Sequence, residues 1–271
     1  LTAVGPAMSC LAGRWLLCSR TQADGSAFVC THHGTFHCDE AMACGMLRML
    51  PEFADMPVVR TRDPAVIDAA YVVVDVGGTS DAEARRFDHH QREFTEPFRP
   101  APEGGATKPE DEPVRMSSAG LVYRQYGRDV IAAITGGSLP ADSAEQVYQK
   151  VYERLIREVD AVDNGVEPFD GPARYRIRTG LGGRVGRLNA SWNEDGGAEV
   201  ENTRFKQAVS WARLLSCRGT PAPCHSRCKC RPLAPLHGAV LPNQPPSPHP
   251  RSIPPSLRHS VARRCSSPAL S

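Results

Sequence analysis

Residues 27–50 read AFVCTHHGTFHCDEAMACGMLRML, and this stretch decides the fold class of the chain. Its first five residues have the composition of a short β-strand, and residues 39–50 predict a helix that Pro51 stops. Further strands are expected at residues 57–60 and 70–76. Strands and helices that alternate at this spacing form βαβ units. We therefore predict an α/β fold with a mostly parallel sheet flanked by helices.

Later in the chain the pattern predicts a loop and two helices. Residues 100–114 are rich in proline, glycine and charge, a composition typical of loops. Residues 117–126 predict a helix, and a longer helix begins at Ser143 and ends at the Asn164-Gly165 pair. We find no internal repeat in the sequence.

The composition is typical of a globular protein. The chain has 271 residues, of which 41% are hydrophobic and 23% charged, and its mean hydropathy is −0.36. These values indicate one or two folded domains rather than a fully disordered chain. No apolar run approaches the roughly 20 residues that cross a bilayer, so we expect no membrane partner. The ten cysteines show no regular spacing and follow no secretory segment, which favours a reduced, intracellular chain.

Charge divides the chain near residue 215. Residues 1–215 carry 30 acidic and 24 basic side chains, whereas residues 216–271 carry eight basic side chains and no acidic one. The second segment also holds 12 of the 24 prolines and has no helical or strand periodicity. We therefore predict a domain at residues 27–215, followed by a disordered tail rich in proline, arginine and cysteine. Residues 1–26 are interpreted as a mitochondrial targeting remnant or as a disordered N-terminus.

Four clusters of potential ligand side chains lie at predicted strand or helix ends. They comprise residues 31–40, Asp75, the run Asp88-His89-His90, and residues 160–165. Taken alone, each has an ordinary explanation, such as Asp39 being a favourable charge at a helix N-terminus or Asp163 a turn residue. Binding sites in parallel α/β folds lie at the carboxyl ends of strands. Because a βαβ sheet brings all four clusters to one rim, a common site is the better interpretation.

The residue types in these clusters indicate a metal centre. Imidazoles and carboxylates without a cysteine pair suit a divalent ion with nitrogen and oxygen ligands. Mn²⁺ is the expected ion, with Mg²⁺ or Zn²⁺ as alternatives. Two ions about 3.5–4 Å apart would share a bridging carboxylate and activate water for attack on phosphorus. Phosphoester hydrolysis is therefore the expected chemistry.

Several sequence blocks occur together in an order that resembles a known family. They are THHGTFHCDEAMACGMLRMLPEFADMPVVRTRDP (31–64), VVVDVGGTSDAEARRFDHHQREFTE (72–96), SSAGLVY (117–123), EVDAVDNG (158–165) and RVGRLNASWN (184–193). Over residues 27–215 the chain resembles the Myg exonuclease family, a branch of the DHH phosphoesterase superfamily. The resemblance implies a DHH-type domain and a metal-dependent 3′-to-5′ RNA exonuclease that processes ribosomal and messenger RNA precursors. It also implies a mitochondrial or nuclear location, with the cytoplasm as the alternative.

The resemblance assigns roles to individual residues. The implied metal ligands are His32, His37, Asp39, Asp75, His89 and Asp163, with Asp160 as the alternative to Asp163. The implied catalytic group comprises Asp75, Asp88, His89 and His90. In this group Asp75 bridges two Mn²⁺ ions, His90 contacts phosphate and Asp88 orients its neighbours. His33 departs from the family pattern, which has asparagine at that position.

Basic and aromatic residues near the end of the domain suggest substrate contacts. The set comprises Arg174, Tyr175, Arg176, Arg178, Arg184, Arg187 and Trp192. Phosphate contacts with base stacking use such a set, and a solvated basic face is the plain alternative. Arg184 and Arg187, together with His90, are the expected substrate contacts. Arg60 and Arg62 are interpreted first as strand-end salt-bridge residues that can reach the site.

The C-terminal segment departs from the family. Members of the family continue into a second α/β domain that covers the cleft, and we expect that domain to be missing here or replaced by the tail. We interpret the tail as the product of a mis-spliced, frame-shifted or truncated gene. A zinc cluster of Cys224, His225, Cys228, Cys230 and His237 is disfavoured because the spacing fits no zinc module well.

Three functions stay open from the sequence. The first is a two-metal 3′-to-5′ exoribonuclease whose partner is RNA, and no stable protein partner is indicated. The second keeps the site but acts on small phosphodiesters, oligonucleotides or inorganic phosphate chains. The third is a catalytically inactive RNA-binding or interaction protein. Metal would then not change the stability of the folded chain, and RNA binding would fall steeply with salt.

Overall fold

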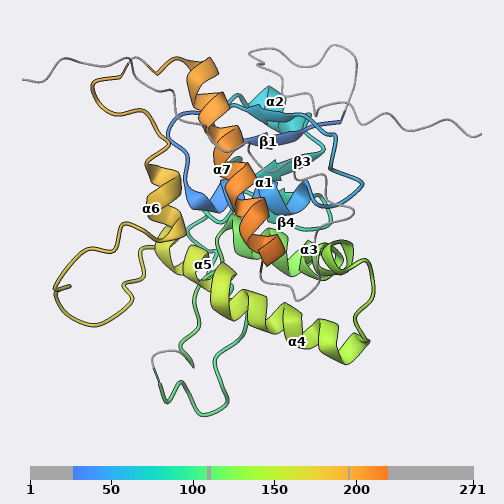
Figure 1. Ribbon diagram of the computed structural model, residues 1–271, viewed down its shortest axis with the longest axis vertical. Coiled ribbons are helices and arrows are strands. Elements are labelled where there is room, and N and C mark those ends of the chain that lie inside the picture. The colour runs from blue at the N-terminus through green and yellow to red at the C-terminus, as the bar shows by residue number, and fades with distance from the viewer. Residues whose placement is uncertain (1–26, 109–110, 195, 219–271) are drawn as a thin grey trace, which may run out of the picture. The chain divides into compact units, whose positions relative to one another are not determined.

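The computed structural model describes residues 27–108, 111–194 and 196–218 (Figure 1). The strands are β1 (Val29–Thr31), β2 (Val58–Arg60), β3 (Val72–Val74), β4 (Ser80–Asp81) and β5 (Arg86–Phe87). The helices are α1 (Cys38–Leu47), α2 (Pro64–Asp68), α3 (Ser118–Thr135), α4 (Ala141–Val151), the π-helix η2 (Tyr152–Ile156), α5 (Arg157–Asp163), α6 (Leu181–Gly186) and α7 (Ala198–Arg218). The predicted segment 1–26, residues 219–271 of the predicted tail, and its cysteine-histidine group lie outside the described residues.

The five strands form one sheet in the order β2-β1-β3-β5-β4. Neighbouring strands are parallel except β4 and β5, which pair antiparallel. The predicted α/β fold with a mostly parallel sheet is therefore confirmed. The β4–β5 pair was not expected, because each strand has two residues and no apolar alternation marks it.

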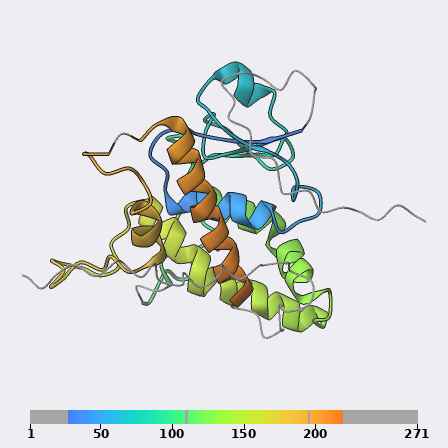
Figure 2. The same cartoon turned by 45° about the horizontal axis from the view of Figure 1, so that its top comes forward.

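The two faces of the sheet bury different side chains, because successive residues of a strand point to opposite sides. Val29, Val72 and Val74 belong to the larger core, which also contains α1 and α3 side chains. Cys30 and Val73 belong to a smaller core that α2 covers. Figure 2 shows α2 on one side of the sheet and α1 on the other. The sheet therefore lies between two layers of helix.

Helix α1 lies in the middle of this arrangement. All ten of its residues are buried, and it packs against α3 and α7. A helix that is covered all round carries apolar or paired side chains on every face. It begins at Cys38 and ends at Leu47, and tighter hydrogen-bonded turns then continue to Leu50, where the helix was predicted to end.

The long helix predicted from Ser143 is present with one irregularity. It begins at Ala141 and contains the wide turn of η2 before α5. The helix predicted at residues 117–126 continues to Thr135, where Gly136 ends it with a φ of 64°. Helices α6 and α7 were not predicted, and α7 runs three residues beyond the predicted domain end at 215. Among the described residues, no helix has the length and apolar character needed to cross a membrane.

Candidate metal centre

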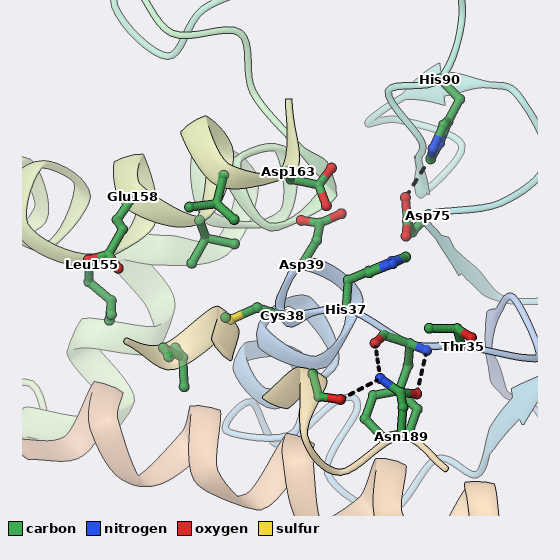
Figure 3. Close-up of a pocket in the computed structure, with 16 residues that line it drawn as sticks. Thr35, His37, Cys38, Asp39, Asp75, His90, Leu155, Glu158, Asp163 and Asn189 are labelled. Carbon is green, nitrogen blue, oxygen red and sulfur yellow. Dashed lines mark hydrogen bonds and ion pairs between the residues drawn. The ribbon is translucent and has the colours of Figure 1, made fainter. Parts of the chain in front are cut away.

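The predicted ligand clusters meet at one rim of the sheet. His32 follows β1, Asp75 follows β3, and the Asp88-His89-His90 run follows β5. The first turn of α1 adds Asp39, and the last residue of α5 is Asp163. Figure 3 shows Asp39, Asp75, Asp163 and His37 together along a cavity. The structure therefore brings the predicted ligand residues into one site.

Asp75 occupies the centre of this site. Its φ of 57° lies in the left-handed region, which a non-glycine residue rarely adopts. Its Oδ2 lies 3.4 Å from His32 Nε2, and its Oδ1 lies 3.6 Å from His89 Nε2. Burial raises the pKa of Asp75, but the nearby imidazoles of His32 and His89 outweigh burial and hold it below the usual range. The two carboxylate oxygens thus face two different groups of ligands.

Asp39 is held by the start of α3. Its carboxylate accepts hydrogen bonds from the Ala119 N–H at 2.6 Å, the Ser118 N–H at 3.1 Å and the Ser117 hydroxyl at 2.5 Å. Burial, followed by the nearby charge of Asp75, raises the pKa of Asp39 well above its usual value. A bound cation would offset both effects. Asp39 is therefore a fixed carboxylate in a place that favours positive charge.

His89 lies between three carboxylates. Its Nε2 is 3.0 Å from Asp163 Oδ2 and 4.0 Å from Asp39 Oδ2. Burial lowers the pKa of His89, but Asp163 and Asp75 outweigh burial and raise the pKa to about 10. Although these carboxylates are near, neither ring nitrogen makes a well-directed hydrogen bond. A buried imidazole of this kind is suited to bind a metal ion.

A second group of ligands surrounds His32. The Nδ1 of His32 lies 3.2 Å from the carbonyl oxygen of His33, which leaves Nε2 facing Glu40 Oε1 at 3.0 Å. Glu40 Oε1 also accepts the backbone N–H of His37 at 2.8 Å, while its Oε2 is buried without a hydrogen-bond partner. The pKa of His32 is raised to about 10, because Asp75 and Glu40 outweigh burial, which lowers it. Glu40 was not among the predicted ligands, because its position three residues after His37 indicates a capping box, which the structure contains.

Three sets of potential ligand atoms result, each gathered within 4.8 Å. They are His32-His37-Glu40, Asp75-His89-His90 and Asp39-His89-Asp163. The donor set is imidazole nitrogen and carboxylate oxygen, which suits divalent ions such as Mn²⁺. The unpartnered nitrogens of His89 and the unpartnered oxygen of Glu40 fit the same interpretation. The site therefore offers enough ligands for more than one cation.

Asp88 and His90 form a supporting pair. Asp88 Oδ2 accepts the Gly78 N–H at 2.6 Å, and its Oδ1 lies 2.7 Å from His90 Nδ1. Asp88 therefore belongs to no ligand set itself and fixes the ring of His90, which does. The hydrogen bond to Asp88 raises the pKa of His90. The His90 side chain is 63% exposed and lines the cavity, where it can meet an anionic ligand.

Asp160, the predicted alternative to Asp163, does not join any of the three ligand sets. Its Oδ1 accepts the Ser117 N–H at 3.0 Å, and its Oδ2 accepts the Tyr152 hydroxyl at 3.1 Å. It is fully buried, and burial raises its pKa to about 6. The geometry thus favours Asp163 over Asp160 as the ligand from α5.

The cavity beside the ligands has a volume of about 520 Å³. Apolar side chains of α5 and α6 line it, and Asn189 closes one end with two hydrogen bonds to the backbone of Phe36 (Figure 3). Arg184 and Arg187 are exposed and do not line the cavity. The guanidinium of Arg184 instead lies 5.5 Å from the Trp211 ring centroid. The role of both arginines as substrate contacts stays a prediction.

Arg60 supports the loop that follows β1. Its guanidinium donates to the carbonyl oxygens of His32 at 3.2 Å and Gly34 at 2.6 Å. The salt bridge expected for this residue is present with Glu201 and, at 4.0 Å, is longer than these two hydrogen bonds. Arg62 is exposed. Arg60 therefore fixes the backbone that carries the first ligands.

Comparison with known proteins gives matches over the same region. The model of the MYG1 exonuclease family, described as uncharacterised protein family UPF0160, matches residues 28–215. A MYG1 protein of Caenorhabditis elegans is 41% identical over 186 residues, which is 69% of this chain and 52% of that protein. The MYG1 exonuclease of Mus musculus is 47% identical over 165 residues, 60% of this chain and 42% of that protein. A MYG1 protein of Saccharomyces cerevisiae is 36% identical over 187 residues, 66% of this chain and 52% of that protein.

The chain spans about half the length of the curated relatives it matches. No solved structure matches the chain.

Proposed function

The chain belongs to the MYG1 exonuclease family, as its sequence blocks predict, and from that premise we propose that it is a metal-dependent hydrolase that shortens RNA from the 3′ end. The observation that carries the proposal is the position of Asp75. One of its oxygens faces His32 and the other faces His89, at 3.4 and 3.6 Å. A carboxylate with this arrangement is suited to bridge two cations.

Two of the ligand sets each contain one imidazole that faces Asp75. His32, which faces Oδ2, belongs to the set with His37 and Glu40, and His89, which faces Oδ1, belongs to the set with Asp39 and Asp163. Two divalent ions, proposed to be Mn²⁺, would act as Lewis acids toward phosphate and make a bound water more acidic. The protein keeps the ligands in place through α3, the strand ends and Arg60.

His90 is the proposed contact to the scissile phosphate. Asp88 fixes its Nδ1, and the ring lies on the cavity wall. An imidazolium at this place can donate a hydrogen bond to a phosphoryl oxygen and stabilise negative charge that develops there. This role needs His90 to be protonated on both ring nitrogens, and the Asp88 carboxylate at Nδ1 favours that state.

Exposed aromatic and basic side chains within residues 174–192 support a nucleic acid as substrate. Trp192 is 99% exposed, and Tyr175 is also largely exposed. Arg174, Arg176 and Arg178 lie in the exposed segment around Tyr175. Aromatic rings stack on bases and arginines contact phosphates in proteins that bind single strands. These features favour RNA over an inorganic phosphate chain, which has no base to stack.

The test is hydrolysis of a 5′-labelled single-stranded RNA by the full chain, with Mn²⁺ or with a chelator. The variant Asp75→Asn removes the bridging charge, and Asp129→Asn changes an exposed carboxylate on α3 as the matched control. We expect progressive shortening that requires Mn²⁺, persists in Asp129→Asn and is lost in Asp75→Asn. Cleavage that survives both the chelator and Asp75→Asn would contradict the proposal. RNA binding without any cleavage would favour the inactive RNA-binding alternative.

A further inference from the structure

A chain of buried hydrogen bonds leads from the metal centre into the helical layer. The Ser117 hydroxyl lies 2.5 Å from Asp39 Oδ1 and 2.7 Å from Asp160 Oδ1. The Ser117 N–H also donates to Asp160 Oδ1, at 3.0 Å, and the Tyr152 hydroxyl donates to Asp160 Oδ2 at 3.1 Å. These side chains are buried, and only Asp39 belongs to a ligand set.

We propose that Asp160 is a positioning residue of the metal centre, which acts through Ser117 to hold the Asp39 carboxylate against the start of α3. The inference rests on the proposed metal centre and does not depend on the substrate. Supporting partners of this kind orient metal ligands and are often nearly as important as the ligands themselves.

The geometry gives Asp160 two points of attachment to Ser117. The first is the hydrogen bond that the backbone N–H of Ser117 donates to Asp160, and the second is the contact with the Ser117 hydroxyl, whose single hydrogen is shared between Asp160 and Asp39. Ser117 therefore has neither a free backbone orientation nor a free side-chain rotamer. Because Ala119 and Ser118 donate to the same carboxylate of Asp39, a shift of this helix start would move three of its hydrogen bonds together.

The space around Asp160 is matched to its carboxylate. A Cβ at Gly120 would lie 2.5 Å from Asp160 Oδ1 and 2.6 Å from Oδ2. Glycine at this position lets the carboxylate lie directly against the first turn of α3. The sequence run Ser117-Ser118-Ala119-Gly120 thus receives Asp39 and Asp160 on the same helix start.

The π-helix η2 supports the other end of the chain of bonds. Tyr152 and Asp160 are eight residues apart, and in a regular α-helix their side chains would point roughly 80° away from each other. The wide turn of η2 begins at Tyr152 and precedes Asp160, and in this helix the Tyr152 hydroxyl reaches the Asp160 carboxylate. Wide turns of this type occur frequently near functional sites.

The test measures Mn²⁺ binding to the full chain by calorimetric titration, without RNA. We expect Asp160→Ala to weaken Mn²⁺ binding about 10- to 100-fold, the usual effect of losing a ligand's supporting partner. Asp160→Asn keeps an acceptor for the Ser117 N–H, so its loss should be smaller. The exposed Asp129→Asn serves as control and should bind like the parent chain.

The pathway through Ser117 is tested by a double-mutant cycle. In a Ser117→Ala background, which removes the hydroxyl contact and keeps the backbone N–H bond, Asp160→Ala should cause a clearly smaller further loss of Mn²⁺ affinity than it causes in the parent chain. A full additional loss in that background would overturn the proposal. So would an Asp160→Ala variant that binds Mn²⁺ as the parent does.

A second variant with a smaller change tests the proposal if Asp160→Ala does not fold. Tyr152→Phe removes only the hydroxyl that donates to Asp160, and we expect about a threefold loss of affinity, as for a weak hydrogen bond. Unchanged affinity in a folded Tyr152→Phe protein, together with an unfolded Asp160→Ala protein, would assign Asp160 to folding alone and overturn the proposal. A parent chain that binds no Mn²⁺ would instead overturn the metal centre itself.

Discussion

Replacing Gly120 with alanine tests how tightly the first turn of α3 packs against the carboxylate of Asp160. Gly120 lies in the first turn of α3, and an added Cβ would lie 2.5 and 2.6 Å from the two oxygens of Asp160. No real Cβ tolerates such distances, so either Asp160 or the helix start must move. Such a movement weakens the bonds from Asp160 to Ser117 that hold this end of α3.

The expected change in the free energy of unfolding has three contributions. Overpacking of a well-packed interior destabilises a protein by about 1–3 kcal/mol. Loss of the buried hydrogen bonds of Asp160 adds about 1–3 kcal/mol. Alanine is favoured over glycine inside a helix by about 1 kcal/mol, which offsets part of this. We therefore expect Gly120→Ala to lower the free energy of unfolding by about 3 kcal/mol.

The assay is urea unfolding in the presence of a chelator, followed by circular dichroism. Gly186→Ala in α6 is the matched control, because a Cβ there meets nothing within 4 Å. That variant should be as stable as the parent or slightly more stable. A Gly120→Ala protein that unfolds at the same urea concentration as the parent would refute the packing argument.

Three further predictions concern the loop, the imidazoles and the substrate. Arg60→Met should lower the free energy of unfolding by about 2–4 kcal/mol, since the buried guanidinium donates to two loop carbonyls, whereas the exposed Arg62→Met should stay within about 0.5 kcal/mol. Urea unfolding of both variants checks this, and equal losses would contradict it. His32 and His89 have pKa values of about 10 in the metal-free fold, against 6.5 ordinarily. Their stabilisation is therefore complete below about pH 6.5 and fades as pH rises toward 10. With a chelator present, the urea concentration at the unfolding midpoint should therefore fall as the pH rises from about 6.5 to 10. A midpoint that rises with pH would contradict the raised pKa values of these two imidazoles. Arg176→Ala should weaken RNA binding and reduce its salt slope by about one, as measured by filter binding at several salt concentrations. An unchanged slope would remove this arginine from the RNA contacts.

The strands and the site's location could be predicted because the signals are local. Val72, Val73 and Val74 form an unbroken β-branched run, which is typical of a strand covered on both faces. Asp75 follows that run directly, so its position at the carboxyl end of a central strand needed no tertiary information. The same argument placed His32 beside it.

Other features depend on packing between distant segments and have no local signal. Ser117 holds Asp39 across 78 residues of sequence, and the contact exists only because α1 packs on α3. Nothing near Arg60 in the sequence shows that its guanidinium turns toward the loop after β1. The wide turn of η2 could not be predicted from the sequence either, since the spacing of apolar residues there fits a regular α-helix.

The most direct test of the central claim is the number of Mn²⁺ ions that the full chain binds. A titration followed by electron paramagnetic resonance should show two ions per chain, coupled to each other at the roughly 3.5–4 Å separation typical of a shared carboxylate. Asp75→Asn should abolish that coupling and at least one of the ions, while Asp129→Asn should keep both. A chain that binds no more than one ion, or whose two ions are unaffected by Asp75→Asn, would contradict the account.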